Sequence, residues 1–199
     1  MNELIKTVGL AKMRVDAGFS RVGRRLKSDD PGDQVMMLLA ARAVSAGNAL
    51  VVLCREGHPN ESLPLLRGIA EFSSAMRWIA AAETGLRARV ALAELDAPRW
   101  EGLWPDARLK ERAEDFGVPV WAAIAALGSA PDFSRGNAQG LPWGHVFAEG
   151  ILPGRKAEET LAAAAVWLAL ALEALDRRWP GDFPGAAEMR DAAQISRGK

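Results

Sequence analysis

The fold is decided by a segment with the sequence LPLLRGIAEFSSAMRWIAAAE (residues 63–83). Apolar side chains recur along it every three or four residues, at Leu65, Ile69, Phe72, Met76 and Ile79. This spacing places them on one face of an α-helix. Leu66, Ala70 and Ala80 add apolar surface beside that face, so most of the circumference favours burial. We therefore expect this segment to be a central helix of a helical protein.

The rest of the chain extends this interpretation to an all-α fold. Alanine is abundant, β-branched residues are sparse, and no segment shows the alternation of a strand. We predict a bundle of four long helices with shorter helices between them, and a long loop rich in Gly, Pro and Trp before the last long helix. The predicted helices span residues 2–27, 33–56, 63–84, 86–97, 105–117, 118–128 and 157–179, and the loop spans 129–156.

The length of 199 residues and an apolar content of 49% suit one compact domain. We expect a helical-bundle domain over residues 1–183 and a tail over 184–199 that forms a weak helix or is disordered. The longest apolar run, LAAAAVWLALAL (161–172), is shorter than the roughly 20 residues that a bilayer requires. It therefore predicts a buried helix, and we expect no membrane association.

Charge and cysteine content exclude several classes of protein. The 25 basic and 25 acidic residues cancel, which argues against a dominant nucleic-acid or anionic-membrane surface. Cys54 is the single cysteine, so neither an intrachain disulfide nor a cysteine-based zinc site is expected. The N-terminal residues carry charges throughout and lack the apolar stretch of a signal peptide. These features predict a cytoplasmic protein.

A second stripe on the 63–83 helix is polar. Arg67, Glu71, Ser74 and Trp78 follow one another at steps of four, three and four, so they share a helix face. One interpretation is a polar pocket in which Arg67 holds an anion or orients Glu71. The other is a local Arg–Glu pair on a solvent-facing stripe, which is common on helix surfaces.

The 33–56 helix carries polar residues at similar spacing, namely Arg42, Ser45 and Asn48. If it packs antiparallel to the 63–83 helix through a short turn, the two polar stripes are expected to face each other. Arg42 and Asn48 are therefore further pocket candidates, although an asparagine in a core helix is more often a structural hydrogen-bonding residue.

The late segment GLPWGHVF supplies His145 and Trp143. Gly and Pro shape its backbone, and an imidazole held there is a candidate general acid or base near neutral pH. The alternative is a histidine that fixes the loop by bonding to the backbone. Two histidines and scattered carboxylates give no metal-binding motif, and nucleotide-binding loops are missing, so we expect neither a metal nor a cofactor.

The run NESLPLLRGIAEFSSAMRWI, followed far downstream by PWGHVF, resembles an uncharacterised family of bacterial helical proteins. In that family an LLRxxxE helix and a later His recur, and the family looks related to the HEPN superfamily of helical bundles. Many HEPN proteins are ribonucleases or toxins of defence and toxin–antitoxin systems. The resemblance implies Arg67, Glu71 and His145 as site positions. HEPN ribonucleases carry an Arg followed four to six residues later by a His, and neither His58 nor His145 has an Arg at that spacing.

Two functions follow from these observations. The first is a HEPN-like, metal-independent nuclease of a defence or toxin–antitoxin system, with RNA as a candidate substrate, Arg67 on the phosphate and His145 as general acid or base. The second is a non-enzymatic module that forms a homodimer or binds a partner protein, in which the Arg/Glu stripe is structural.

Overall fold

The computed structural model describes residues 1–82, 84–95, 106–127 and 153–197. Within these ranges the chain forms eight α-helices and no strand, so the predicted all-α class is confirmed. The helices are α1 (Asn2–Val22), α2 (Pro31–Arg55), α3 (Leu63–Ala81), α4 (Thr84–Leu95), α5 (Asp106–Asp115), α6 (Val120–Leu127), α9 (Pro153–Arg178) and α10 (Ala186–Arg197).

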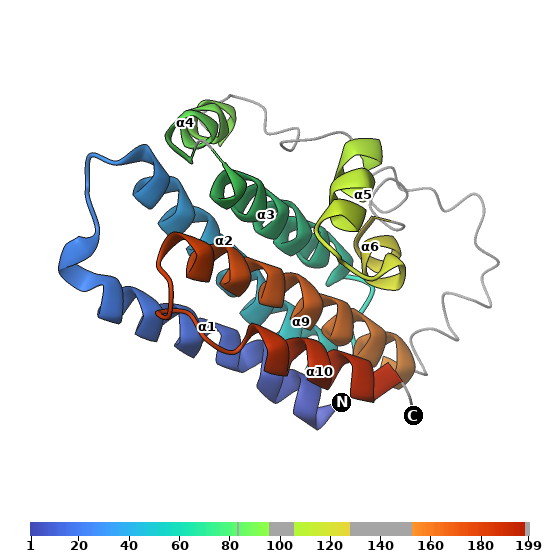
Figure 1. Cartoon of the computed structure of the whole chain (residues 1–199). Coiled ribbons are helices and arrows are strands. Elements are labelled where there is room, and N and C mark those ends of the chain that lie inside the picture. The colour runs from blue at the N-terminus through green and yellow to red at the C-terminus, as the bar shows by residue number, and fades with distance from the viewer. Residues whose placement is uncertain (83, 96–105, 128–152, 198–199) are drawn as a thin grey trace.

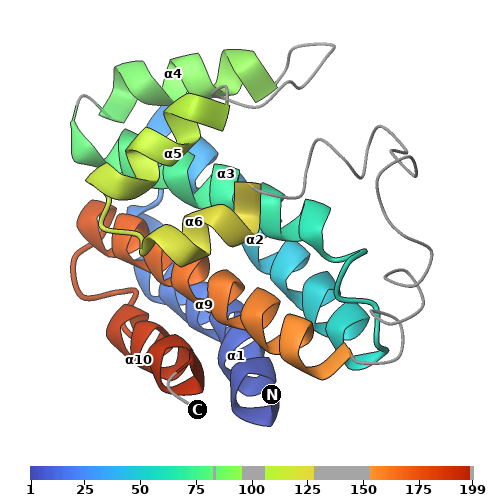
Figure 2. The same ribbon diagram turned by 90° about the vertical axis from the view of Figure 1, so that its right-hand side faces the viewer.

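Helix α9 lies at the centre of the arrangement, where it contacts α1, α2, α3, α6 and α10 (Figure 1). Every residue from Thr160 to Leu172 is buried, because neighbouring helices cover α9 on all sides. The apolar run at 161–172 is therefore a core helix, as predicted. Helices α4, α5 and α6 lie on one side of this centre, and α1 and α10 lie on the other (Figure 2).

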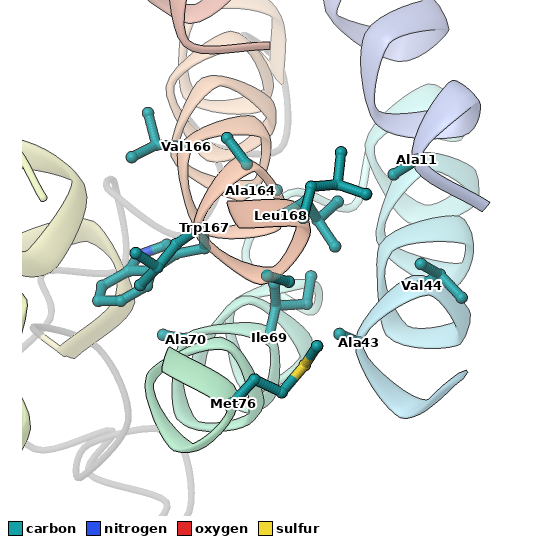
Figure 3. Close-up of a cluster of buried hydrophobic side chains, with 14 of the residues drawn as sticks. Ala11, Ala43, Val44, Ile69, Ala70, Met76, Ala164, Val166, Trp167 and Leu168 are labelled. Atoms are coloured by element: carbon teal, nitrogen blue, oxygen red, sulfur yellow. The ribbon is translucent and has the colours of Figure 1, made fainter. Parts of the chain in front are cut away.

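The core is built where α9 meets α2 and α3 (Figure 3). Trp167 is fully buried, points towards Ala70 of α3, and donates its indole N–H to the carbonyl oxygen of Ala122 in α6 at 3.1 Å. On the other side of α9, Leu168 reaches towards α2. Alanines at the crossing points let the helices approach closely, since a small side chain leaves room for the large side chain opposite.

The first helix is shorter than the predicted 2–27. It ends at Val22, and a single 3₁₀ turn, Gly23–Arg25, follows. Gly23 has a φ of 45°, a left-handed value that favours glycine and stops the helix.

The start of α2 is fixed by carboxylates and one distant arginine. Asp30 is the N-cap and accepts hydrogen bonds from the backbone N–H groups of Gly32 and Asp33. The guanidinium of Arg178, at the end of α9, donates to Asp33 at 2.7 Å and to Asp30 at 3.1 Å. This network ties the start of α2 to the end of α9 and sets the position of α2.

Residues after 184 form a packed helix rather than a free tail. Met189 and Ala193, four residues apart, bury one face of α10 against the bundle. The Arg190 guanidinium makes two hydrogen bonds to the Glu173 carboxylate, at 2.8 and 3.0 Å. Just before α10, the Phe183 ring packs edge-on to Phe19 of α1.

Among the described residues, α2 is the one helix long and apolar enough to cross a membrane. Buried residues such as Met36, Leu39, Ala43 and Leu50 place one of its faces in the protein core. That arrangement is also typical of the core helix of a helical bundle, so α2 alone gives no evidence of a membrane location.

Candidate functional site

The predicted polar stripe of α3 forms an ion pair that is mostly withdrawn from water. The Arg67 Nε donates to Glu71 Oε1 at 2.8 Å, and the two side chains are only 17% and 11% exposed. Helical spacing brings the two residues together, since positions i and i+4 lie one turn apart. Their low exposure argues against the interpretation of a solvent-facing pair.

Two serines beside this pair are buried with unpaired hydroxyls. Ser73 and Ser74 are 0% exposed, and neither hydroxyl has a hydrogen-bond partner. A buried hydroxyl without a hydrogen-bond partner destabilises the folded state, because its lost hydrogen bonds to water are not replaced. Ser74 belongs to the predicted stripe and Ser73 lies on a neighbouring face of the same helix.

At the C-terminal end of the polar stripe of α3, two arginines lie over the indole ring of Trp78. The guanidiniums of Arg87 in α4 and Arg112 in α5 lie 5.0 and 5.6 Å from the centre of the Trp78 ring. Arg87 Nη1 also donates to the Trp78 carbonyl oxygen at 2.6 Å, which satisfies a carbonyl near the end of α3. Cation–π contacts of this kind hold α4 and α5 to α3.

Arg77, next to Trp78 in sequence, extends the positive charge to another side of α3. Its guanidinium lies over the Phe116 ring at 5.4 Å. Burial is the main cause that lowers the pKa of Arg77, and the charge of Arg177 adds to it, while Glu173 opposes the shift. Nothing in the sequence singles out Arg77, Arg87 or Arg112, because these arginines reach the aromatic rings only through the packing of separate helices.

The polar residues of α2 do not join the α3 stripe. Arg42 and Ser45 are exposed on the outward face of α2, and Asn48 is half-buried. The expectation that the two polar stripes face each other is therefore wrong. Helices α2 and α3 do contact each other, but α2 presents its apolar face to the core.

The two candidates from the late segment, His145 and Trp143, lie outside the described residues. The structure therefore places Arg67 and Glu71 together and gives no position for the third predicted catalytic residue. The predicted loop at 129–156 also lies almost entirely outside the described ranges.

The described residues offer no ready-made centre for a metal ion. No group of three or more His, Cys, Asp or Glu side chains comes together among them. His58 is exposed just after the end of α2, and Cys54 is buried. Burial raises the pKa of the Cys54 thiol despite the Ser62 hydroxyl 3.7 Å away.

The outward face of α2 is a surface that sequence reasoning missed. The name α2 stripe is used here for its uncharged part, which consists of the exposed residues Leu38, Ala41, Ser45, Ala49 and Val52 and has the exposed Arg42 at its edge. These residues follow at steps of three and four, so they line one face of the helix. Leu38 is 39% exposed and Val52 is 57% exposed, and no residue of the stripe is charged.

Two hollows on the surface of the described residues lie away from the α2 stripe. One of about 370 Å³ is lined by α1 and by the residues around Gly185, and another of about 410 Å³ lies between the end of α9 and the start of α10. Neither is lined by Arg67, Glu71 or the α2 stripe.

In comparisons with known proteins, no family model, curated protein or solved structure matches the chain.

Proposed function

We propose that the protein is a non-enzymatic helical module that associates with another protein through the α2 stripe. The observation that carries this proposal is the α2 stripe itself, five exposed residues without charge beside the exposed Arg42, on a helix whose other face is buried in the core. Outward faces of surface helices are normally charged or polar, so a face of this composition favours a covered surface.

The energetics of the α2 stripe support association of moderate strength. Burying the exposed parts of Leu38 and Val52 would contribute about 1 kcal/mol each, since complete burial of such a side chain contributes roughly 1.5–3 kcal/mol. The three residues between them are small, so a partner helix can approach the α2 backbone closely. The stripe therefore gains its binding energy from close packing along its whole length.

The α2 stripe is also fixed in position in the unbound protein. Asp30 caps the helix, and Arg178 anchors that cap to the end of α9. Gly47, on the buried side, lies close to Leu168, where an added Cβ would be 3.2 Å from the leucine Cδ1. A helix fixed along its inner face presents its outer face with little loss of conformational entropy on binding.

Photo-cross-linking in the native host cell tests this proposal. A photoreactive amino acid at Ser45 should give protein adducts that disappear when Leu38→Arg is added to the same chain. The same amino acid at Ser20, which is exposed on α1, is the matched control and should give none. Equal labelling from both positions, or no adduct from Ser45, would overturn the proposed association.

A second candidate is the HEPN-like, metal-independent nuclease of a defence or toxin–antitoxin system. The low exposure of the Arg67–Glu71 pair, beside the unpaired hydroxyl of Ser74, favours it, because buried polar groups that reduce stability are often found at functional sites. In this hypothesis Arg67 stabilises the phosphate charge and His145 transfers the proton.

The nuclease hypothesis is tested with purified protein, RNA and single-stranded DNA in the presence of a chelator. Cleavage should be lost in Arg67→Ala and His145→Ala, while Ser20→Ala keeps it. Intact nucleic acid with the unaltered chain, or full cleavage by His145→Ala, would remove this candidate and leave the association proposal untouched.

A further inference from the structure

We infer that the partner of the α2 stripe is a second copy of this chain, with the two α2 helices antiparallel and a two-fold axis at Ser45. This inference rests on the proposed association through the stripe. A two-fold interface uses the same surface on both subunits, so that surface must be complementary to itself. The order of residues along the α2 stripe meets this condition.

The α2 stripe is symmetrical in side-chain size about Ser45. Two residues lie on either side of Ser45, and when one helix is reversed they pair large with large and small with small. In the antiparallel arrangement Leu38 lies opposite Val52 of the second copy, and Ala41 lies opposite Ala49 of the second copy. Ser45 lies opposite itself, so small residues occupy the middle of the interface and large residues close its two ends.

The charges beside the stripe favour the antiparallel direction. Arg42, exposed at the edge of the stripe, would lie opposite Asn48 of the second copy. At the ends, Gln34 would lie opposite Glu56 of the second copy, so no like charges meet. A parallel pair in register would instead place the two Arg42 side chains together, which is unfavourable. The net charge of zero adds no repulsion between whole subunits.

The composition of the stripe fits another helix better than a lipid surface. Helices that lie on membranes present Trp, Phe or Leu to the lipid and Lys or Arg around them. Here the middle of the face is Ala41, Ser45 and Ala49, which contribute little to lipid burial but permit close helix packing. From Leu38 to Val52 the α2 stripe is about 21 Å long, which a single partner helix can cover. A contact of one helix pair predicts a reversible dimer rather than an obligate one.

Sedimentation velocity of the purified chain tests the oligomeric state. We expect the mass to rise with concentration from 21.4 kDa towards twice that value. Ser45→Arg brings two positive charges together on the axis and should weaken dimerisation about 100-fold or more. Ser20→Arg is the control and should dimerise like the unaltered chain. Circular dichroism melts of both variants show that the fold is kept.

Disulfide cross-linking between two differently tagged variants tests the direction of the helices. Leu38→Cys mixed with Val52→Cys should give the mixed dimer, because these positions lie opposite each other. Leu38→Cys alone should give little, since its two copies lie about 21 Å apart along the helix axis. Cys54 is buried, so the unaltered chain gives the background.

The outcomes separate this inference from the proposed function. The chain could stay monomeric at all concentrations while a photoreactive residue at Ser45 still forms adducts of other masses. That result would refute a second copy as the partner but would leave the proposed association with a different protein standing. Flotation with anionic vesicles in place of dimerisation would overturn both. Efficient cross-linking of Leu38→Cys with itself would overturn the antiparallel direction.

Discussion

The close approach of α1 to the segment before α10 predicts a clear difference between two glycine substitutions. A Cβ added at Gly18 would lie within 3.0 Å of three atoms of the Phe183 ring, and 2.8 Å from its Cζ. The ring cannot retreat easily, because it also packs against Phe19 at 5.1 Å and Trp179 at 5.7 Å between centroids. Gly9 lies on the same helix, and a Cβ added there meets nothing within 4 Å.

The two effects can be estimated separately. Replacing glycine by alanine inside a helix stabilises it by about 1 kcal/mol, which is the full expectation for Gly9→Ala. At Gly18 the same gain is opposed by overpacking, which typically costs about 1–3 kcal/mol. We therefore expect Gly18→Ala to be destabilising by about 1 kcal/mol, and the two variants to differ by about 2 kcal/mol.

Urea unfolding and thermal melts measure this difference. For a chain of this size 1 kcal/mol corresponds to a change in Tm of about 2–4 °C, so Gly9→Ala should raise the Tm and Gly18→Ala should lower it by that amount. Adding Phe183→Leu should reduce the penalty at Gly18, because the obstructing ring is gone. If Gly18→Ala stabilises the chain as much as Gly9→Ala does, the aromatic cluster is not fixed in the way argued above.

Three further predictions concern side chains with defined surroundings. Glu71→Ala should lower the free energy of unfolding by about 2 kcal/mol in urea melts, because it breaks a mostly buried pair. Asp16→Ala breaks an exposed pair of the same spacing on α1 and should cost less than about 0.5 kcal/mol. Burial raises the pKa of Asp30, but backbone hydrogen bonds and the Arg178 charge outweigh it and hold that pKa below its usual value. A lowered carboxyl pKa stabilises the fold above about pH 3.9 and loses that effect as the pH falls through the folded value, so Asp30→Ala and the unaltered chain should converge in acid melts. The Cys54 thiol should react with a thiol reagent only at the rate of unfolding, and rapid labelling at neutral pH would contradict its burial.

The sequence was sufficient for the fold class because helical periodicity is a local property. The run at 161–172 is apolar on all sides, and the structure buries it on all sides. Helix α10 was harder to predict, because only Met189 and Ala193 mark its buried face among polar residues. Its stability comes from packing on α9, which local propensity does not report.

The candidate site was predictable only where its residues share a helix. The spacing of Arg67 and Glu71 predicted their contact, and the structure confirms it at 2.8 Å. The spacing did not predict their burial, since that depends on the elements packed around α3. The arginines on Trp78 come from α4 and α5, and nothing in the sequence near Trp78 indicates them.

The α2 stripe shows why an apolar pattern is ambiguous until the packing is known. A helix that is apolar on two faces is predicted to be buried on both, and the sequence does not say whether the second face is covered by the same chain. The structure covers one face and leaves the other exposed. The same chain builds a charged outward surface on α5, where Lys110, Glu111 and Glu114 are exposed. The lack of charge is therefore confined to the α2 stripe. The proposed dimer would account for it, because a second subunit would cover this surface as the core covers the inner face.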